Sequence, residues 1–371
     1  MDFNLFLGLF STLGLGYMYI GYQAAQNVKT LDDYFLAGRQ LGLFALTIAL
    51  IATQLGGGII LGTSKEAYSH GIYGIMYVVG ISIGFLILAS GFAAHLRRFN
   101  VNTTAELFQT EFKSEHLKKI ASLLSMLSLC GILLAQVVAS RNLMLSLNVY
   151  SETIFILFWL FVIGYTMLGG LRAIVNNDIF QLAFIIAVFC SIFAYELIGN
   201  PGGVITTLTS TPLFDFSSFF SWSRLLAIVI IPACYSLIEQ DIAQTLFAAR
   251  SPKIALLGTF IASIFMLCFA LIPVYFGIQA QRLGLIIPEG ANPLISLFDQ
   301  TYSPALVTLV VYGVFAAIIS TADALLCAIS SHLVQDFNLT AHSKHALTIS
   351  KSVTFSIGIA ALVQSENSKQ E

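Results

Sequence analysis

Long apolar stretches, separated by short polar segments, run through almost all of this sequence and limit what it can fold into. The first extends from Phe3 to Tyr22, and stretches of similar length recur along the rest of the chain. A helix needs about 20 apolar residues to cross a lipid bilayer. A chain of 371 residues with this pattern predicts an all-α polytopic membrane protein with about ten spans.

The composition excludes two broad classes of protein. Charged residues make up 10% of the chain, whereas they make up about 25% of an average soluble domain. A surface with so few ions cannot face water on all sides, which excludes a soluble enzyme. The net charge of -2 provides no basic field for a nucleic acid, so we expect the lipid bilayer and not nucleic acid as a partner.

The predicted spans divide the chain into four parts. Residues 1–23 form an extra N-terminal helix, 42–198 a first unit of five helices, 222–363 a second and incomplete unit, and 364–371 a polar tail. A loop rich in Gly, Pro, Thr and Ser, 199–221, separates the two units. After the first helix, the individual spans are expected at about 42–63, 72–95, 119–147, 153–168, 174–198, 225–249, 254–279, 304–337 and 346–363.

The distribution of basic residues predicts the orientation of the chain. With the N-terminus outside, most of the 17 Lys and Arg residues fall in cytoplasmic segments, as the positive-inside rule requires. We therefore expect a multi-pass protein of the cell membrane, which in a Gram-negative source is the inner membrane, with its N-terminus outside.

Two of the predicted helices are interrupted. The second span contains three consecutive glycines, Gly56 to Gly58, and the span near 225–249 contains Pro232 followed by the polar residues Glu239 to Asp241. Glycine weakens a helix and proline removes a backbone donor. The two breaks lie five spans apart, and because five is odd, the second would enter the membrane from the opposite side, as in the inverted repeats of secondary transporters. Close packing of glycines and an ordinary proline kink are the alternative interpretation.

Freed backbone carbonyls beside such a break are natural ligands for a small cation. Ala52 and Leu55 precede the glycines at a spacing of three, so both carbonyls can point to one side. Ala317, Ser320 and Thr321 lie at i, i+3 and i+4, on one face of a later helix. Together they offer five neutral oxygens, a set that suits Na⁺. Hydrogen bonding of the hydroxyls within or between helices is the alternative.

Four segments resemble the sodium:solute symporter family, in the family's order. They are the loop 32–39 (DDYFLAGR), the segment 165–173 (YTMLGGLRA) followed by Asp178 and Gln181, the segment 240–251 that ends in AARS, and the segment 316–323 (AAIISTAD). The resemblance implies a LeuT-type core preceded by one extra helix, which moves a small organic solute together with Na⁺ by alternating access. It implies Na⁺ as the coupling ion and no organic cofactor.

The resemblance also assigns expected roles to individual residues. Gln54 falls where relatives place a polar or acidic residue near the solute. The residues on the family's main sodium positions are Ala52, Leu55, Ala317, Ser320 and Thr321, and the expected solute or gate contacts on the second interrupted helix are Glu239, Gln240 and Asp241.

Charged residues inside spans are costly unless they are paired or hydrated, so Asp178, Asp241 and Asp323 each need a role. The residues expected to act in gating or coupling are Arg39, Asp178 and Asp323. Asp178 is expected to pair with a basic residue such as Arg39 or Arg172, or else to take part in ion traffic. Asp323 either ends a hydrogen-bond network or approaches an ion. Relatives that bind a second sodium use serines where this chain has Asp323 and Ala324, which argues against a second ion at Asp178.

The last core helix of the family pattern has no counterpart before the polar run 365–371. A truncated, non-transporting protein, either inert or a sensor or partner of a full-length relative, is therefore the alternative to a symporter. A membrane-embedded enzyme is disfavoured because the sequence lacks His-Glu-x-x-His, Gly-x-Ser-x-Gly and phosphate-loop motifs. The solute and the oligomeric state stay open.

Overall fold

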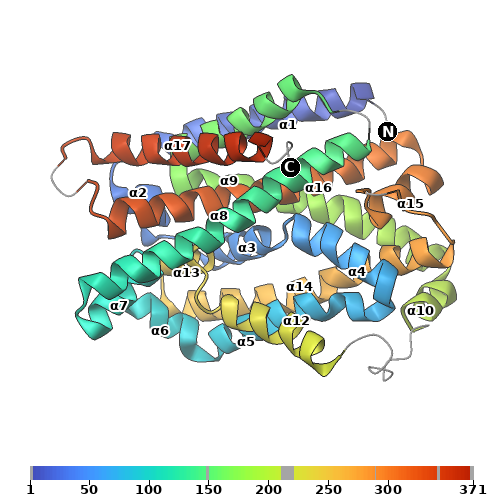
Figure 1. Cartoon of the computed structure of the whole chain (residues 1–371), viewed down its shortest axis with the longest axis horizontal. Coiled ribbons are helices and arrows are strands. Elements are labelled where there is room, and N and C mark those ends of the chain that lie inside the picture. Colours follow the sequence, from blue (N-terminus) through green and yellow to red (C-terminus); the bar gives the residue numbers. More distant parts are fainter. Residues whose placement is uncertain (1–2, 148–149, 210–220, 289, 341–342, 368–371) are drawn as a thin grey trace.

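A computed structural model describes residues 3–147, 150–209, 221–288, 290–340 and 343–367. Within these ranges every regular element is a helix, apart from an isolated parallel bridge between Leu41 and Ala249 (Figure 1). Eight of the described helical segments are long and apolar enough to cross a membrane. The expected all-α polytopic class is therefore confirmed.

The first half of the chain begins with α1, Phe3–Ala25. The short elements α2, Leu31–Leu36, and η1, Ala37–Arg39, lead into the first interrupted helix. Its parts are α3, Leu43–Gln54, the π-helical η2, Gly58–Gly62, and α4, Thr63–His70. The next span combines η3, Gly71–Ile75, α5, Met76–Ile87, η4, Leu88–Phe92, and α6, Ala93–Arg98. The remaining helices of this half are α7, Thr104–Phe112, α8, Glu115–Ser146, and α9, Glu152–Gly199.

The second half contains the other interrupted helix, formed by α12, Trp222–Tyr235, and α13, Gln240–Phe247. It continues with α14, Pro252–Arg282, and α15, Pro293–Thr301. The last elements are α16, Pro304–Ser331, the π-helical η5, His332–Asp336, and α17, Ala346–Asn367. Both predicted breaks are present, because α3 stops at Gln54 and α12 is separated from α13 by a non-helical Glu239.

Two mergers explain why eight candidate spans correspond to ten predicted ones: α9 covers two predicted spans, and Gly58–Arg98 joins the second part of the first interrupted helix to the next span, while α3 is too short to count alone. Gly170 has φ of 55° and ψ of -148°, which interrupts the helical geometry within α9. A Cβ at this position would overlap the backbone oxygen of Tyr34. Positive φ and close backbone approach both require glycine, so this residue sets the turn between the two halves of α9.

One expectation about the loops was wrong. The segment predicted as the loop 199–221 contains a helix, α10, Pro201–Thr209, which begins with proline, a residue well suited to the first turn of a helix. Residues 210–220 of that loop lie outside the described ranges. The polar tail 364–371 stays a prediction: α17 continues to Asn367, and residues 368–371 lie outside the described ranges.

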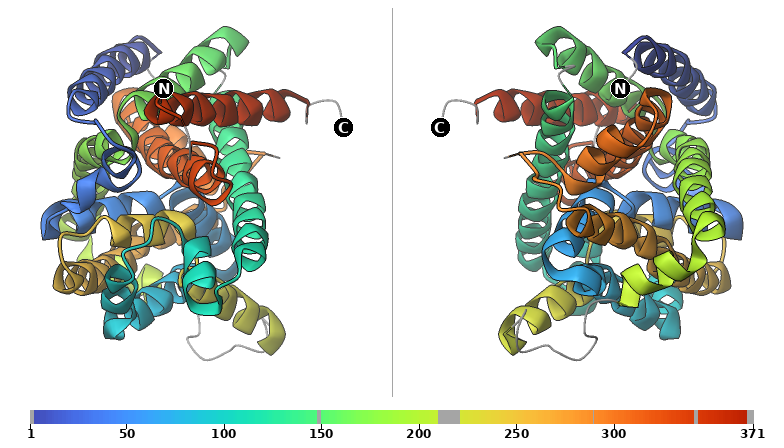
Figure 2. Two further views of the ribbon diagram at one scale, coloured as in Figure 1. Left: turned by 90° about the vertical axis from the view of Figure 1, so that its left-hand side faces the viewer. Right: turned by 90° about the vertical axis from the view of Figure 1, so that its right-hand side faces the viewer.

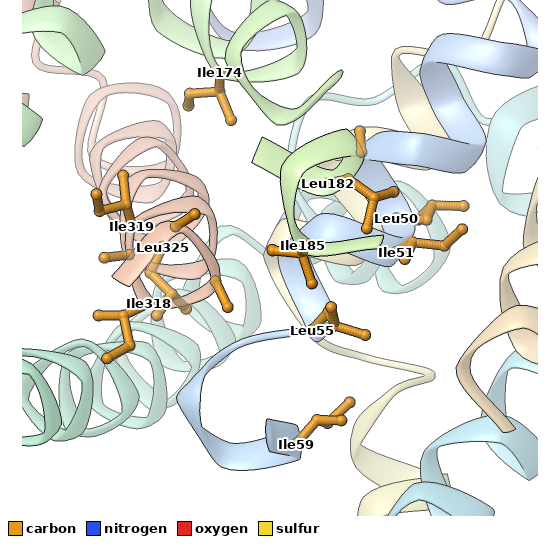
Figure 3. Close-up of a cluster of buried hydrophobic side chains, with 14 of the residues drawn as sticks. Leu50, Ile51, Leu55, Ile59, Ile174, Leu182, Ile185, Ile318, Ile319 and Leu325 are labelled. Atoms are coloured by element: carbon orange, nitrogen blue, oxygen red, sulfur yellow. The ribbon is translucent and has the colours of Figure 1, made fainter. Parts of the chain in front are cut away.

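The helix α16 occupies the centre of the bundle. The most apolar part of its span, Pro304–Asp336, is 83% buried, compared with 22% for the span that contains α1. Figure 2 shows α16 enclosed by α1, α9, α17 and α8. Apolar side chains of α16 pack with those of α3 and α9 around the break in the first interrupted helix (Figure 3). This packing places the end of α3 directly against the middle of α16.

Candidate functional site

The residues predicted to bind a cation meet where α3 ends against α16. The hydroxyl oxygen of Ser320 lies 3.0 Å from the carbonyl oxygen of Ala52 and 3.0 Å from that of Ala317. All three residues are fully buried. A hydroxyl has one proton to donate, so it can satisfy only one of these carbonyls at a time, and oxygen lone pairs are left over in a dry environment.

Thr321 joins the same cluster through a neighbouring carbonyl. Its hydroxyl donates to the backbone oxygen of Thr53 at 2.8 Å. A Cβ on Gly56 would overlap the Thr321 hydroxyl and lie 3.1 Å from the Thr321 Cβ. The first glycine of the break therefore allows α16 to approach the end of α3. Leu55 is buried at the same break, and its N–H donates to Ile51 O at 2.8 Å.

A cavity of about 110 Å³ adjoins this oxygen cluster, with Thr53 and Thr321 in both. Both interrupted helices contribute to its polar wall, and Gln54 from α3 donates to Glu239 Oε2 at 3.3 Å across it. Its other described lining residues are Gly56, Gly58, Ile59, Tyr77, Ile81, Ile132, Gln136, Pro232, Tyr235, Ser236 and Asp241. Gln54, Glu239 and Asp241, predicted to contact a solute, thus share one cavity.

Gln240 points elsewhere. Its side-chain oxygen accepts from the backbone N–H of Thr104 at 2.7 Å and from the Thr104 hydroxyl at 3.0 Å, and its amide donates to the backbone oxygen of Asn102. It fastens the start of α13 to the segment before α7. The structure does not place this side chain among the residues that line the cavity.

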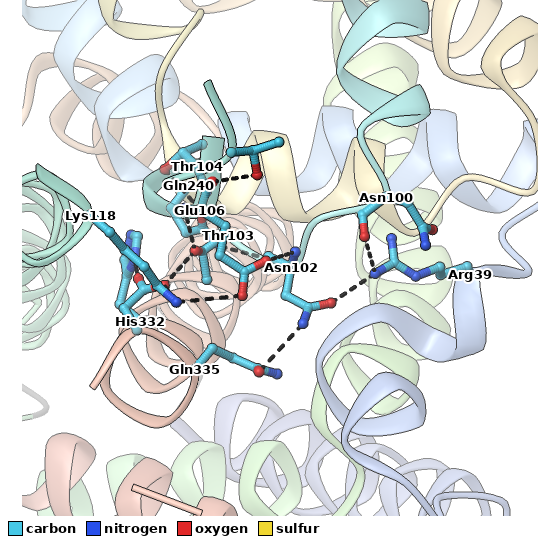
Figure 4. A network of polar contacts seen from close by, with 12 residues as sticks. Arg39, Asn100, Asn102, Thr103, Thr104, Glu106, Lys118, Gln240, His332 and Gln335 are labelled. Atoms are coloured by element: carbon cyan, nitrogen blue, oxygen red, sulfur yellow. Dashed lines mark hydrogen bonds and ion pairs between the residues drawn. The ribbon is translucent and has the colours of Figure 1, made fainter. Parts of the chain in front are cut away.

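Arg39 belongs to the same polar network at one end of the bundle (Figure 4). Its guanidinium donates to the side chain of Asn102 at 2.8 Å and to the backbone oxygen of Val101 at 3.2 Å. Asn102 in turn donates to Gln335 on η5. The adjacent Thr103 donates to Asp336 at 2.7 Å. The segment 100–104 therefore connects η1, α13 and η5.

The predicted pairing of Asp178 with Arg39 or Arg172 was wrong. Asp178 is fully buried, and neither of its carboxyl oxygens has a hydrogen-bond partner among the described residues. Arg172 instead approaches the backbone oxygen of Asn27, at 3.5 Å. Asp178 therefore lies buried inside the bundle, and its position near a predicted span end did not indicate this.

Asp323 takes part in a buried hydrogen bond between helices. Its Oδ2 accepts from the hydroxyl of Tyr165 at 2.5 Å, whereas its Oδ1 has no partner among the described residues. Asp323 of α16 is thereby linked to the first half of α9.

Sequence reasoning missed several residues of the site. Thr53 directly follows the predicted ligand Ala52, and its carbonyl lies in the last turn of α3, where carbonyls lack helical partners. Its place before the glycines could therefore have identified it from the sequence. Gln136 of α8 and the two tyrosines, Tyr77 of α5 and Tyr235 of α12, line the cavity. No local pattern marked these three, because they come from helices that pack against the break only in three dimensions.

Comparison with protein families gives one match that covers most of the chain. The model described as the sodium:solute symporter family matches residues 34–366. The chain is 24% identical to the sodium/proline symporter of Haemophilus influenzae, over 95% of this chain and 76% of that protein. It is 29% identical to the sodium/pantothenate symporter of Escherichia coli, over 41% of this chain and 32% of that protein.

Comparison with solved structures supports the LeuT-type fold expected from the sequence. The structure of a Na⁺-coupled sialic acid symporter in a substrate-bound outward-open state matches with a TM-score of 0.82, at 20% identity, over 97% of this chain and 80% of that chain. The nucleobase-cation-symport transporter Mhp1 matches with a TM-score of 0.53, at 18% identity, over 89% of this chain and 72% of that chain. At these identities the likeness concerns the fold.

Proposed function

Because the chain belongs to the sodium:solute symporter family, we propose that it carries a small organic solute across the cell membrane together with Na⁺, by alternating access. The observation that supports this proposal most directly is the meeting of Ser320 with the carbonyls of Ala52 and Ala317, at 3.0 Å each. The N-terminus outside, favoured by the distribution of basic residues, is part of the same proposal.

The proposed sodium ligands are neutral oxygens from two helices. They are the carbonyls of Ala52, Leu55 and Ala317 and the hydroxyls of Ser320 and Thr321. The carbonyl of Thr53 is a candidate addition, because it already accepts the Thr321 hydroxyl at 2.8 Å. These oxygens belong to buried residues, and their lone pairs would coordinate a cation bound among them. An ion here would hold the end of α3 against α16.

The proposed solute site is the neighbouring cavity. Gln54, Glu239 and Asp241 line it, and we leave Gln240 out because its side chain is bonded to the segment before α7. Thr53 and Gln54 are adjacent on α3, so an ion that orders the end of this helix also positions Gln54 for a solute. Coupling requires the ion to bind one conformation better than the other, and the shared end of α3 is the element through which we expect that preference to act.

The polar network around Arg39 is the proposed gate at the opposite end from the solute's entry. Its contacts join η1 and α13 to η5 at the end of α16. Because the two interrupted helices and α16 line the cavity, the cavity cannot open toward this end without breaking these bonds. Asp178 and Asp323, which are buried between α9 and α16, are proposed to contribute to coupling between those helices.

A transport assay tests the proposal. The purified protein is reconstituted into liposomes, and uptake is screened over radiolabelled amines, amino acids, sugars and monocarboxylates, with an inward gradient of Na⁺ or of K⁺. A membrane potential supplies about 2.3 kcal/mol per charge and 100 mV, so we expect strong accumulation with Na⁺ and none with K⁺. Uptake that is equal with both ions would refute sodium coupling.

A matched pair of variants tests the ion site. Ser320→Ala removes a hydroxyl that lies between two carbonyls, so the sodium concentration for half-maximal uptake should rise. Ser330→Ala is the control, because its hydroxyl donates only within α16, to Leu326 O at 2.6 Å. An equal sodium requirement in the two variants would contradict the assigned ligand.

A further inference from the structure

The cavity next to the proposed sodium site has a strongly biased chemistry. Its polar wall carries two acidic side chains, Glu239 and Asp241, and the carboxamides of Gln54 and Gln136. None of the described residues that line it is Lys, Arg or His. A group with a negative charge would therefore find no cationic side chain among the described residues of this cavity.

The two acids are buried without a protein counter-charge. Glu239 is 7% exposed and Asp241 3%. In the described part of the chain, neither forms an ion pair with a basic side chain. Glu239 Oε2 accepts from Gln54, and Asp241 Oδ1 accepts from the backbone N–H of Ile242 at 2.9 Å. Neutral donors of this kind help to hold a carboxylate, but they do not balance its charge.

Gln136 supplies an independent sign that a ligand is expected. This residue is 7% exposed, and its Oε1 atom has no hydrogen-bond partner among the described residues. That oxygen lies 3.3 Å from the position of a Cβ on Gly57, so it faces the break between α3 and η2. A buried acceptor without a donor is costly. A solute with an N–H group would satisfy it.

We propose that the recognised group of the solute is a cationic nitrogen that bears N–H groups, a primary or secondary ammonium, held by Glu239 and Asp241 and donating to Gln136 Oε1. This inference rests on the proposed function, because it takes the cavity as the solute site. It excludes a free carboxylate as the main recognised group. The cavity volume of about 110 Å³ is below the range of about 300–1,000 Å³ for sites of drug-sized ligands, so the solute is small.

Charge balance connects the ammonium to sodium. The proposed sodium ligands are carbonyls and hydroxyls and carry no net charge, so they leave the ion's charge uncompensated. Two carboxylates in the adjoining cavity match one Na⁺ and one ammonium. In a buried region of low dielectric constant, such neutrality matters far more than in water. Each cation then lessens the imbalance that the two acids create, and binding of both is favoured over binding of either alone.

A binding assay on the purified full chain separates this inference from the proposed function. The melting temperature is first measured in Na⁺ and in K⁺ without any solute. K⁺ replaces Na⁺ in the comparison because choline, another common substitute for Na⁺, is itself an organic ammonium ion. Three probes of one carbon skeleton are then titrated in Na⁺: n-butylammonium, butyramide and butyrate. We expect stabilisation by Na⁺ alone, and a half-maximal concentration about tenfold lower for n-butylammonium than for butyramide, which corresponds to about 1.4 kcal/mol. Butyrate should produce no shift.

Isosteric variants show which side chains recognise the positive charge of n-butylammonium. Glu239→Gln and Asp241→Asn keep the shape of the side chains and remove their charge. Each should raise the half-maximal concentration of n-butylammonium about tenfold while the stabilisation by Na⁺ alone persists. Glu66→Gln is the control, because Glu66 lies on α4 near Arg224, with its side chain 45% exposed, and does not line the cavity. It should change neither response.

The possible results lead to different conclusions. Equal or tighter binding of butyramide or butyrate, no response to n-butylammonium, or an unchanged preference in both acid variants would overturn the ammonium inference. Each of these can occur with sodium stabilisation intact, which would leave the proposed function in place. If Na⁺ alone gives no more stabilisation than K⁺ while n-butylammonium still binds through the two acids, sodium coupling fails and the assignment of the cavity stands.

Discussion

Gly56→Ala should damage the proposed sodium site without changing a single polar group. A Cβ at this position would overlap the Thr321 hydroxyl and lie 3.1 Å from the Thr321 Cβ and 3.3 Å from its Cγ2. The three contacts involve most of one buried side chain, so Thr321 must turn away or α16 must move. Either movement breaks the 2.8 Å hydrogen bond from Thr321 to Thr53 O.

The magnitude follows from two contributions. Loss of a buried hydrogen bond destabilises a protein by about 1 kcal/mol, and overpacking a close contact adds about 1–3 kcal/mol. The variant should therefore be less stable, by about 2–4 kcal/mol in total. Since a proposed sodium ligand is displaced, the sodium concentration for half-maximal stabilisation should rise by about tenfold or more, equivalent to about 1.4 kcal/mol.

The assay is a sodium titration of the melting temperature, with K⁺ holding the ionic strength constant. Gly58→Ala is the matched control, because this glycine adjoins the same break and a Cβ there would meet nothing within 4 Å. The double variant Gly56→Ala with Thr321→Ala should recover part of the stability, since the contacts with the Thr321 hydroxyl and Cγ2 are gone while the 3.1 Å contact between the two Cβ atoms remains. It should not recover sodium affinity. The reasoning is refuted if Gly56→Ala keeps the wild-type sodium response, or if Gly58→Ala impairs it equally.

Two further predictions concern the fold. Gly170→Ala should lower the melting temperature far more than Gly164→Ala, because at position 170 φ is positive and the added Cβ overlaps Tyr34 O, whereas at 164 the nearest atom is 3.9 Å away; equal melting temperatures would contradict the assigned turn. Burial acts to raise the pKa of Asp33, but hydrogen bonds from the backbone N–H of Lys29 and from Thr30 hold this pKa below its ordinary value. Stabilisation by the Asp33 carboxylate should therefore be present above about pH 4 and be lost as the pH falls through the lowered pKa. In an acid titration of the melting temperature, Asp33→Asn should lack this loss, and a profile parallel to wild type would exclude the contribution.

The helices and their two interruptions were predictable from the sequence because they depend on local properties. An apolar stretch in a bilayer must form a helix to satisfy its own backbone, and glycine or proline interrupts a helix wherever it occurs. The end of α3 at Gln54 and the non-helical Glu239 follow from these rules. The helix α10 did not, since its segment is short and rich in residues that are typical of loops.

The spacing of Ala317, Ser320 and Thr321 placed them on one face of a helix, but spacing alone cannot say which carbonyls that face meets. The contact with Ala52 and Thr53 depends on how closely α16 packs against α3, which Gly56 permits. The same limit applies to Asp178, whose position near a predicted span end indicated an arginine partner, whereas the fold buries it without one.

Sequence alone thus determined that this chain spans a membrane as helices, where two of those helices break, and which oxygens lie beside the breaks. Only the tertiary structure decided which side chains face each other across them. Glu239 and Gln136 are far apart along the chain and become neighbours of one cavity through the packing of α8 and α13 around the end of α3. The charge of that cavity depends on side chains from several helices. No local sequence pattern could therefore predict that charge or the kind of solute that we propose from it.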